Sequence, residues 1–175
     1  TAARLRRLNE EDQIIMFERG EHVSFSNCSL PYFLGGHISS SDKLVLMSPQ
    51  KFLKQYNIIA KTQSEVIAIN RQDKNITIKD LASGETYTES YDKLVLAPGA
   101  KPIVPAIAGI ENVNLFTVRN VTDIQKLHIA IQDKSKSVAV IGGGFIGVEI
   151  AENLREAGYA VSLIEAMPQI LRIFD

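Results

Sequence analysis

Apolar and polar residues recur along this chain with two different periods, and each period indicates a type of element. Small and apolar residues spaced three to four apart predict a helix over residues 1–11. A short apolar run then predicts a buried strand over residues 13–18. Ser48 followed by Pro49 is typical of a helix start, so we expect a helix from there to about Tyr56.

Alternation with a period of two residues dominates the middle of the chain. It predicts short strands at residues 65–69, 75–79 and 85–88, with a turn at Ser83-Gly84 before the last of them. Strands joined by such short connections pair as an antiparallel meander. We expect this meander to be an insertion in an α/β domain and to act as scaffold.

Residues 91–100 contain the apolar run Leu94 to Leu96, which predicts a further strand, and end in a turn of small residues. Pro102 and Pro105 follow, and they prevent continued strand pairing because proline has no backbone N–H. We therefore expect a domain boundary near this point. Residues 1–106 would form one domain and residues 107–175 the beginning of a second.

The last third of the chain predicts a complete βαβ unit. Residues 121–132 indicate a helix and residues 137–141 a buried strand, which is followed directly by a glycine loop. A helix then runs to about Ala157, Gly158 turns the chain, and residues 159–164 predict a second strand.

The glycine loop has the pattern G-x-G-x-x-G, and its glycines have separate roles. Gly142 permits a tight turn, Gly144 lets the backbone approach a pyrophosphate, and Gly147 lets the helix pack closely on the strand. The pyrophosphate would lie at the helix N-terminus, where unpaired N–H groups attract negative charge. Glu165 ends the second strand, where an acid binds a ribose 2′-hydroxyl and repels a 2′-phosphate. The unit therefore predicts a nicotinamide dinucleotide site that favours NADH, with NADPH left open by Arg172.

The strand predicted over residues 13–18 also ends in a carboxylate. A helix followed by such a strand resembles the second half of a dinucleotide-binding βαβ unit. Glu18 is therefore a candidate to bind the ribose hydroxyls of an adenosine. A solvated acid at a strand end is an equally weighted alternative.

Composition excludes several classes of protein. The chain has 19 Lys and Arg against 20 Asp and Glu, so we expect neither nucleic acid nor an anionic membrane as a partner. A single cysteine argues against a disulfide-rich secreted protein and fits a reducing cytosol. The start of the chain shows no signal-peptide pattern. His22, His37 and His128 are too scattered to predict a metal site.

Cys28 lies in the segment from Ser24 to Tyr32 and has no cysteine partner in the chain. Cysteine is most often a small buried hydrophobe, which is the first alternative. The two nucleotide-binding patterns favour a second, in which electrons pass from NADH through a flavin to a sulfur on Cys28. That sulfur must come from another molecule, or Cys28 must cycle through a sulfenic acid. Lys43 faces either the flavin or the solvent.

Together these motifs resemble the pyridine nucleotide-disulfide oxidoreductase family, in its single-cysteine branch of coenzyme A-disulfide reductases, NADH oxidases and NADH peroxidases. The resemblance covers essentially the whole chain. It is carried by Phe17 to Arg19, Ser24 to Tyr32, Asp92 to Ala100 and Gly142 to Glu149. Asparagine before the cysteine and Leu-Pro-Tyr after it are most similar to the coenzyme A-disulfide and persulfide reductases. Oxidases and peroxidases of the branch more often have serine there and lack Leu-Pro.

The resemblance implies an α/β fold with two Rossmann-like domains built from βαβ units with parallel sheets. Both domains would be incomplete in this chain, which would lack the first strand, the first glycine loop and a C-terminal dimerisation domain. Cys28 would be the catalytic cysteine beside the flavin. The residues expected at FAD or NADH are Glu18, Arg19, Ser24, Asn27, Lys43, Val66, Ala97, Pro98, Gly99, Gly142, Gly144, Phe145, Ile146, Gly147, Glu149 and Glu165.

The full-length protein is accordingly expected to be a cytoplasmic homodimer that uses FAD and NADH to reduce coenzyme A disulfide or a related small disulfide or persulfide. One alternative is an NADH oxidase or peroxidase in which Cys28 forms a sulfenic acid. Another is a nucleotide-binding module without turnover. Ser29 departs from the glycine or alanine usual in the family, which is a mild change.

Overall fold

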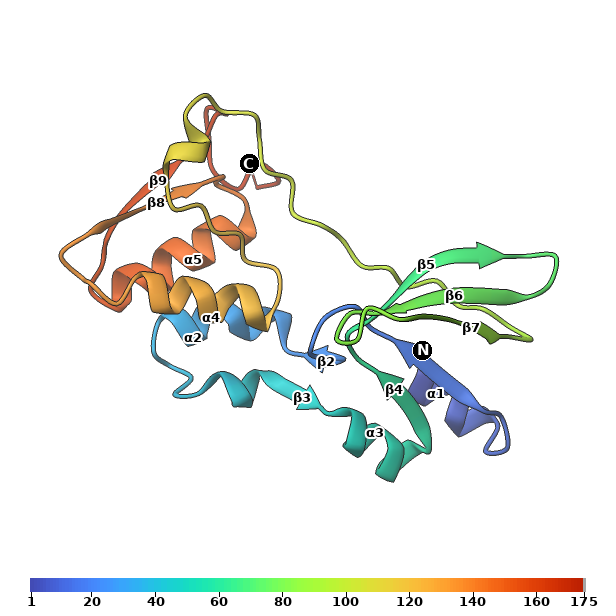
Figure 1. The fold of residues 1–175 in the computed structure, drawn as a ribbon. Coiled ribbons are helices and arrows are strands. Elements are labelled where there is room, and N and C mark those ends of the chain that lie inside the picture. The colour runs from blue at the N-terminus through green and yellow to red at the C-terminus, as the bar shows by residue number, and fades with distance from the viewer. Residues whose placement is uncertain (175) are drawn as a thin grey trace. The chain divides into compact units, whose positions relative to one another are not determined.

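A computed structural model describes residues 1–174, which form two compact units (Figure 1). The first unit contains Thr1–Phe25 and Leu46–Ala100, and the second contains Ser26–Val45 and the residues from Lys101 onward. Asp175 lies outside the described residues. These units are groups of residues in close contact, and the predicted domain boundary near residue 106 stays a prediction.

The first unit is built on a parallel strand pair and an antiparallel meander. Its elements are α1 (Ala2–Leu8), β1 (Ile14–Phe17), β2 (Ser24–Phe25), α3 (Pro49–Tyr56), β4 (Ile58–Lys61), β5 (Ser64–Asn70), β6 (Asn75–Asp80) and β7 (Thr86–Ser90). The short strand β3 (Val45–Met47) pairs with β2 and begins at the unit boundary.

The three predicted strands of the meander are present, and β6 and β7 show the predicted alternation in burial, whereas most of β5 is exposed. Strands β5, β6 and β7 are antiparallel neighbours in that order, with an irregularity in register between Val66 and Ala68. Alternate residues Ile76 and Ile78 of β6 are buried, which is the physical basis of the period of two. Helix α3 begins as predicted, because the Ser48 side chain accepts a hydrogen bond from the Lys51 N–H at 3.2 Å.

The parallel pair consists of β1 and β4, and its register places Phe17 opposite Lys61. Strand β4 was not among the predicted elements, although Ile58 is completely buried. The predicted helix over residues 1–11 ends earlier, at Leu8. The chain after it is held by a buried arginine.

Arg6 is buried in the first unit and is paired entirely with backbone carbonyl groups. Its guanidinium donates to the carbonyl oxygens of Asn9 (3.2 Å), Glu10 (2.5 Å), Asp12 (2.6 Å), Tyr56 (2.8 Å) and Asn57 (2.9 Å). All three guanidinium nitrogens take part, so the cost of burying this charge is offset by hydrogen bonds. Arg6 thereby ties the turn before β1 to the end of α3.

The second unit contains the predicted βαβ unit and the cysteine segment. Its elements are the short 3₁₀ helices η1 (Asn27–Ser29), η2 (Ser41–Leu44) and η3 (Ile110–Asn112), and the helices and strands α2 (Leu30–Leu34), α4 (Val121–Ala130), β8 (Ser137–Ile141), α5 (Phe145–Glu156) and β9 (Ala160–Ile164). Strands β8 and β9 are parallel and joined by α5, as the sequence predicts.

Helix α5 lies at the centre of the second unit. It packs on β9 and is also in contact with α2, which in turn packs on α4 (Figure 1). The buried residues Leu30 and Leu34 of α2, Ile124 of α4, and Ile150 and Leu154 of α5 supply the apolar surface between these helices. The mixed α/β architecture with parallel βαβ pairs and an antiparallel meander is the predicted fold class.

The strand predicted at the start of residues 91–100 is absent, and this prediction was wrong. These residues have no regular secondary structure, and Val95 and Leu96 are 56% and 68% exposed. A strand exists only where its N–H and C=O groups pair with a neighbour, and an apolar run does not provide that neighbour. No helix among the described residues is long and apolar enough to cross a membrane.

Candidate dinucleotide site and cysteine segment

The glycine loop closes tightly between β8 and α5. Gly142 has a φ of +108°, in the region that favours glycine, and its N–H donates to the Ile164 carbonyl at 2.8 Å. A Cβ on Gly147 would lie 1.8 Å from the Gly142 carbonyl oxygen, which no packed structure permits without movement. These contacts confirm the close packing of helix on strand inferred from the motif.

Gly144 is different, because a Cβ built on it would meet no atom within 4 Å. It caps the N-terminus of α5, where Phe145 and Ile146 are 53% and 62% exposed. The open space at Gly144 and the start of a twelve-residue helix suit an anionic group approaching the backbone. Glu149 lies half-buried one turn further along, and its carbonyl accepts a hydrogen bond from Asn153 Nδ2 at 2.9 Å.

Glu165, directly after β9, is bonded to the glycine loop. Its Oε2 accepts a hydrogen bond from the Gly143 N–H at 2.6 Å, and its Oε1 accepts one from the Met167 N–H at 2.8 Å. The N–H groups of Met167 and Gly143 lower the pKa of Glu165 below its ordinary value, and the charge of Arg172 adds to this effect. Glu165 is therefore a fixed carboxylate beside the glycine loop.

Cys28 lies in η1 and is exposed, so the alternative of a buried small hydrophobe is wrong. A hydrogen bond of 2.7 Å joins the hydroxyl oxygens of Ser26 and Ser29, on either side of the thiol residue. Helix α2 follows at once and buries Leu30 and Pro31. The exposed thiol is thus carried on a short segment that is anchored by its own apolar helix.

Two contacts join the end of this segment to α5. A Cβ on Gly35 would lie 2.7 Å from Asn153 Oδ1, so α2 and α5 approach closely because this residue is glycine. His37 Nε2 lies 2.9 Å from Glu156 Oε2. The cysteine segment and the helix that follows the glycine loop therefore belong to one packed unit.

Ser24 is the first residue of the cysteine segment, and Lys43 follows that segment in sequence. Lys43 is in η2, and its ammonium donates to Ser39 Oγ at 2.9 Å on an exposed surface. Ser24 is half-buried in the short strand β2. Their predicted roles at a cofactor stay predictions.

In the first unit, Glu18 directly follows β1 as predicted. Its Oε1 accepts a hydrogen bond from the Gly20 N–H at 2.6 Å. Arg19 lies 3.6 Å from Glu65 in an exposed ion pair, and Glu65 precedes Val66, which is 39% exposed. The structure therefore brings Glu18 and Arg19 together with the start of β5.

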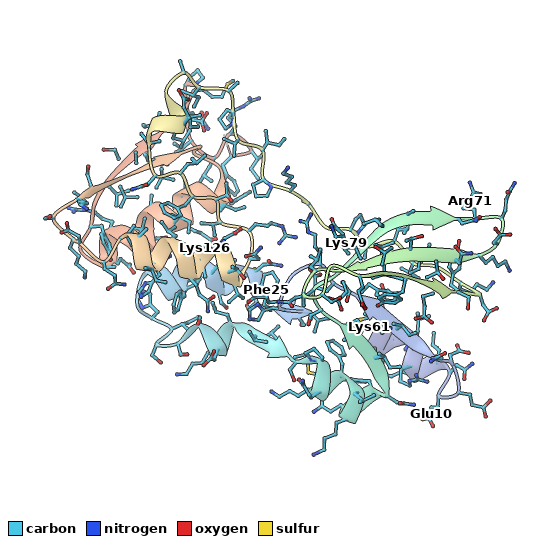
Figure 2. All side chains as sticks on the ribbon, in the orientation of Figure 1. Glu10, Phe25, Lys61, Arg71, Lys79 and Lys126 are labelled. Atoms are coloured by element: carbon cyan, nitrogen blue, oxygen red, sulfur yellow. The ribbon has the colours of Figure 1, made fainter. Side chains whose placement is uncertain are left out.

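Lys61 marks the same end of the parallel pair (Figure 2). Its ammonium lies 5.4 Å from the ring centroid of Phe17 and 5.0 Å from that of Tyr87, within the range of cation–π attraction. The Lys61 ammonium is also 3.5 Å from Glu89. These contacts join the carboxyl end of the parallel pair to the meander.

Ala97, Pro98 and Gly99 lie in the irregular, exposed segment at the end of the first unit. Gly99 has a φ of +70°, which favours glycine at this bend. The structure does not bring these residues into the hydrogen-bonded group around Glu18. Their predicted place beside a cofactor stays a prediction.

Two residues of the second unit that contact predicted site residues were not among the predictions from the sequence. Gly143, between the motif glycines, donates to Glu165, and a Cβ on it would lie 2.7 Å from Ile170 Cγ2. Arg119 donates to Asn27 Oδ1 at 3.2 Å beside Cys28. Gly143 was visible as the middle one of three consecutive glycines, whereas Arg119 is 92 residues from its partner and gave no signal.

A parallel βαβ unit with a closed glycine loop and a fixed acid after its second strand is the architecture of a dinucleotide-binding domain. The family model for pyridine nucleotide-disulphide oxidoreductases matches residues 1–175. The chain belongs to this family.

Curated relatives of the chain include coenzyme A disulfide reductases of staphylococci. The protein from Staphylococcus haemolyticus is 35% identical over 175 residues, which cover 99% of this chain and 39% of that protein. The protein from Staphylococcus aureus strain JH9 is 37% identical over the same shares. The chain thus spans about two fifths of the length of these relatives.

Solved structures share the fold over nearly the whole chain. Reduced CoADR-RHD of Bacillus anthracis is 52% identical with a TM-score of 0.95, covering 99% of this chain and 32% of that one. A NAD-dependent persulfide reductase from A. fulgidus is 33% identical with a TM-score of 0.91, covering 98% and 32%. The water-forming NADH oxidase of Lactobacillus brevis is 32% identical with a TM-score of 0.88, covering 98% and 38%.

An engineered NADPH oxidase made from the L. brevis enzyme was solved with NADPH bound, and it is 31% identical to this chain with a TM-score of 0.88, covering 98% and 38%. It carries a glycine-to-alanine change and, eighteen residues later, an aspartate-to-alanine change. The next two positions change from alanine to arginine and from methionine to serine. A proline-to-arginine change lies seven residues after the aspartate.

Proposed function

We propose that the full-length protein carrying this chain is an FAD-dependent, NADH-consuming reductase of coenzyme A disulfide or a related small disulfide or persulfide. The observation that carries the proposal is the exposed Cys28 in the same compact unit as the glycine loop. The names of the relatives from Staphylococcus and A. fulgidus support the substrate class.

In this proposal, Cys28 acts as a thiolate nucleophile toward an external disulfide. Its sulfur attacks one sulfur of coenzyme A disulfide, forms a mixed disulfide and releases one coenzyme A thiol. The bound flavin supplies the two electrons that NADH delivers. Reduction of the mixed disulfide releases the second coenzyme A and restores Cys28. The balanced reaction converts NADH, one proton and coenzyme A disulfide to NAD⁺ and two coenzyme A.

Glu18 and Arg19 would hold the adenosine part of FAD, with Val66 beside them. The contact of Arg19 with Glu65 and the end of β1 at Glu18 support this assignment, because they place an acid at the carboxyl end of a parallel strand pair. Ser24, Asn27, Lys43, Ala97, Pro98 and Gly99 would complete the contacts of this chain with FAD.

NADH would bind at Gly142, Gly144 and Gly147, with Phe145 and Ile146 at the helix N-terminus and Glu149 near the nicotinamide. The fixed carboxylate of Glu165 supports NADH over NADPH, because it would accept from a ribose hydroxyl and repel a 2′-phosphate.

The L. brevis oxidase and its engineered form support the same preference. The spacing of the five engineered changes falls in this chain on Gly147, Glu165, Ala166, Met167 and Arg172. Four of these residues match the glycine, acid, alanine and methionine that were replaced in that enzyme. Arg172 instead matches the arginine that was introduced. NADPH would therefore be a poorer substrate that is still accepted.

The second candidate function is an NADH oxidase or peroxidase in which Cys28 forms a sulfenic acid. Similarity to the water-forming NADH oxidase of L. brevis favours it. In this case oxygen or peroxide, rather than a disulfide, would take the electrons.

Cytoplasmic location and a homodimer are further parts of the proposal. A single cysteine in 175 residues supports a reducing compartment, and the family resemblance supports the dimer. Sedimentation of the full-length protein at micromolar concentration would test the dimer, and a monomer would contradict it.

The two candidate functions differ in their electron acceptor, which one experiment separates. NADH oxidation by the full-length protein is followed without oxygen, with coenzyme A disulfide as the acceptor and Cys28→Ser as the control. We expect NADH consumption by the wild type and none by the variant, which retains its flavin. Turnover that begins only when oxygen or peroxide is admitted would replace the reductase with the oxidase.

A further inference from the structure

The strongest feature that the proposed function does not use is the contact between Arg119 and Asn27. Arg119 Nη1 donates to Asn27 Oδ1 at 3.2 Å, and Asn27 directly precedes Cys28 in η1. A guanidinium can only donate, so the Asn27 amide oxygen must face Arg119. The N–H₂ group on the other side of the Asn27 amide can then donate to a ligand, while one of the two lone pairs of the amide oxygen is occupied by Arg119.

Arg119 is held in place at the start of α4. Its backbone N–H donates to Asp123 Oδ2 at 3.2 Å, and the Asp123 N–H donates to Asn120 Oδ1 at 2.8 Å. Asn120 is the N-cap of α4. The half-buried Arg119 side chain therefore extends from a hydrogen-bonded turn.

Helix α4 is itself fixed to the cysteine segment. The rings of Phe33 and His128 lie 4.9 Å apart between centroids, and Gln125 Nε2 donates to Ser41 Oγ at 2.8 Å. The packing of α4 on α2 adds apolar contact, with Ile124 fully buried. The separation of Arg119 and Asn27 is therefore set by the packing of the second unit.

We infer that Arg119 is a positioning residue that orients the Asn27 amide so that its N–H₂ group meets a hydrogen-bond acceptor of the disulfide bound at Cys28. The inference rests on the proposed function and adds a rule for its substrate. A disulfide with amide carbonyl or phosphate oxygens near its sulfur is favoured over one that has only donors.

The test is thiol-disulfide exchange at Cys28 in the full-length protein, reduced beforehand and kept without NADH. The Cys28 thiolate attacks the added disulfide, forms the mixed disulfide and releases a thiolate that takes up the proton lost by Cys28, with no net oxidation. Mass spectrometry gives the rate with coenzyme A disulfide and with cystamine, whose ammonium groups are donors only.

With coenzyme A disulfide, we expect Arg119→Met and Asn27→Ala each to slow the exchange by about tenfold, since one hydrogen bond to a charged or oriented group is lost. The double variant should be no slower than either single variant, because Arg119 acts through Asn27. Arg119→Lys keeps a donor and should recover most of the rate. Cystamine should react equally fast with all variants.

Lys126→Met is the matched control, because Lys126 is an exposed cation on α4, the helix that Arg119 precedes (Figure 2). It should keep the wild-type exchange rate with both disulfides. Additive losses in the double variant, or equal losses with cystamine, would overturn the inference. The predicted exchange pattern without any NADH-driven turnover would support the inference and refute the proposed function.

Discussion

The two parallel strand pairs of this protein both end in an acid, and they hold it differently. Strands β8 and β9 end beside a glycine loop, and Glu165 bonds to that loop through Gly143. Strands β1 and β4 end at Glu18, which bonds to Gly20 in its own turn. The hydrogen bonds from Met167 and Gly143 also lower the pKa of Glu165.

The difference shows that an acid at a strand end can be held by a hydrogen bond from the loop that follows the neighbouring strand, as Glu165 is, or only by its own turn, as Glu18 is. The Gly143 N–H holds one oxygen of the Glu165 carboxylate at 2.6 Å. Glu18 has the same place in its strand pair, and its orientation depends on a local turn. The position of an acid directly after a strand can therefore be read from the sequence, whereas the hydrogen bonds that hold its side chain depend on the loop after the neighbouring strand.

The largest expected effect concerns the first pair, whose surroundings depend on Arg6. Arg6→Met would leave several carbonyl groups without their donor in a buried place, so we expect the free energy of unfolding to fall by about 3 kcal/mol or more. Urea unfolding at neutral pH measures this. Arg7→Met, at an exposed neighbour, is the control, and an equal loss there would contradict the account.

The second prediction separates two glycines of the loop. Gly147→Ala forces a Cβ toward the Gly142 carbonyl and should cost about 2 kcal/mol of stability. The alanine in the engineered oxidase at the matching spacing indicates that the fold survives such a change. Gly144→Ala meets open space, so its stability should match the wild type while its affinity for NADH falls. Thermal melts and NADH titrations would contradict this if Gly144→Ala were the less stable variant.

The third and smallest effect is the pH dependence contributed by Glu165. Its pKa is lower when folded than its ordinary value of 4.5, so its stabilisation is full above that value and is lost as the pH falls through the folded pKa. Glu165→Gln should therefore flatten the decline in stability below pH 4.5. Urea midpoints measured between pH 7 and pH 3 test this, and an unchanged slope would contradict it.

The sequence predicted the second strand pair more completely than the first, for physical reasons. The glycine loop allows little variation in geometry, because Gly147 packs directly against the Gly142 carbonyl. The spacing of the glycines in the sequence therefore predicts the structure of the loop. Strand β4 was missed because four residues are too few to show a period, and unlike the equally short β1 this strand is not followed by an acid that marks a dinucleotide-binding strand. The predicted strand from Tyr91 failed because pairing depends on a neighbour that no local pattern specifies.

The candidate site shows the same limit. Gly142, Gly144, Gly147 and Glu165 were found from spacing, since their roles depend on residues close in sequence. The contact of Arg119 with Asn27 is created by the packing of α4 on α2, and no periodicity reports such a contact. Long-range polar pairs of this kind become visible only in the folded unit.

In the proposed function, Glu165 belongs to the NADH site and Glu18 to the FAD site. The most direct test of this assignment is the ratio of kcat/KM for NADH over NADPH in Glu165→Ala and Glu18→Ala forms of the full-length protein. We predict that Glu165→Ala lowers the ratio by about tenfold or more, a change of ~1.4 kcal/mol, because a carboxylate no longer repels the 2′-phosphate. Glu18→Ala should reduce flavin content and leave the ratio unchanged. An unchanged ratio in Glu165→Ala, or a changed one in Glu18→Ala, would contradict the account.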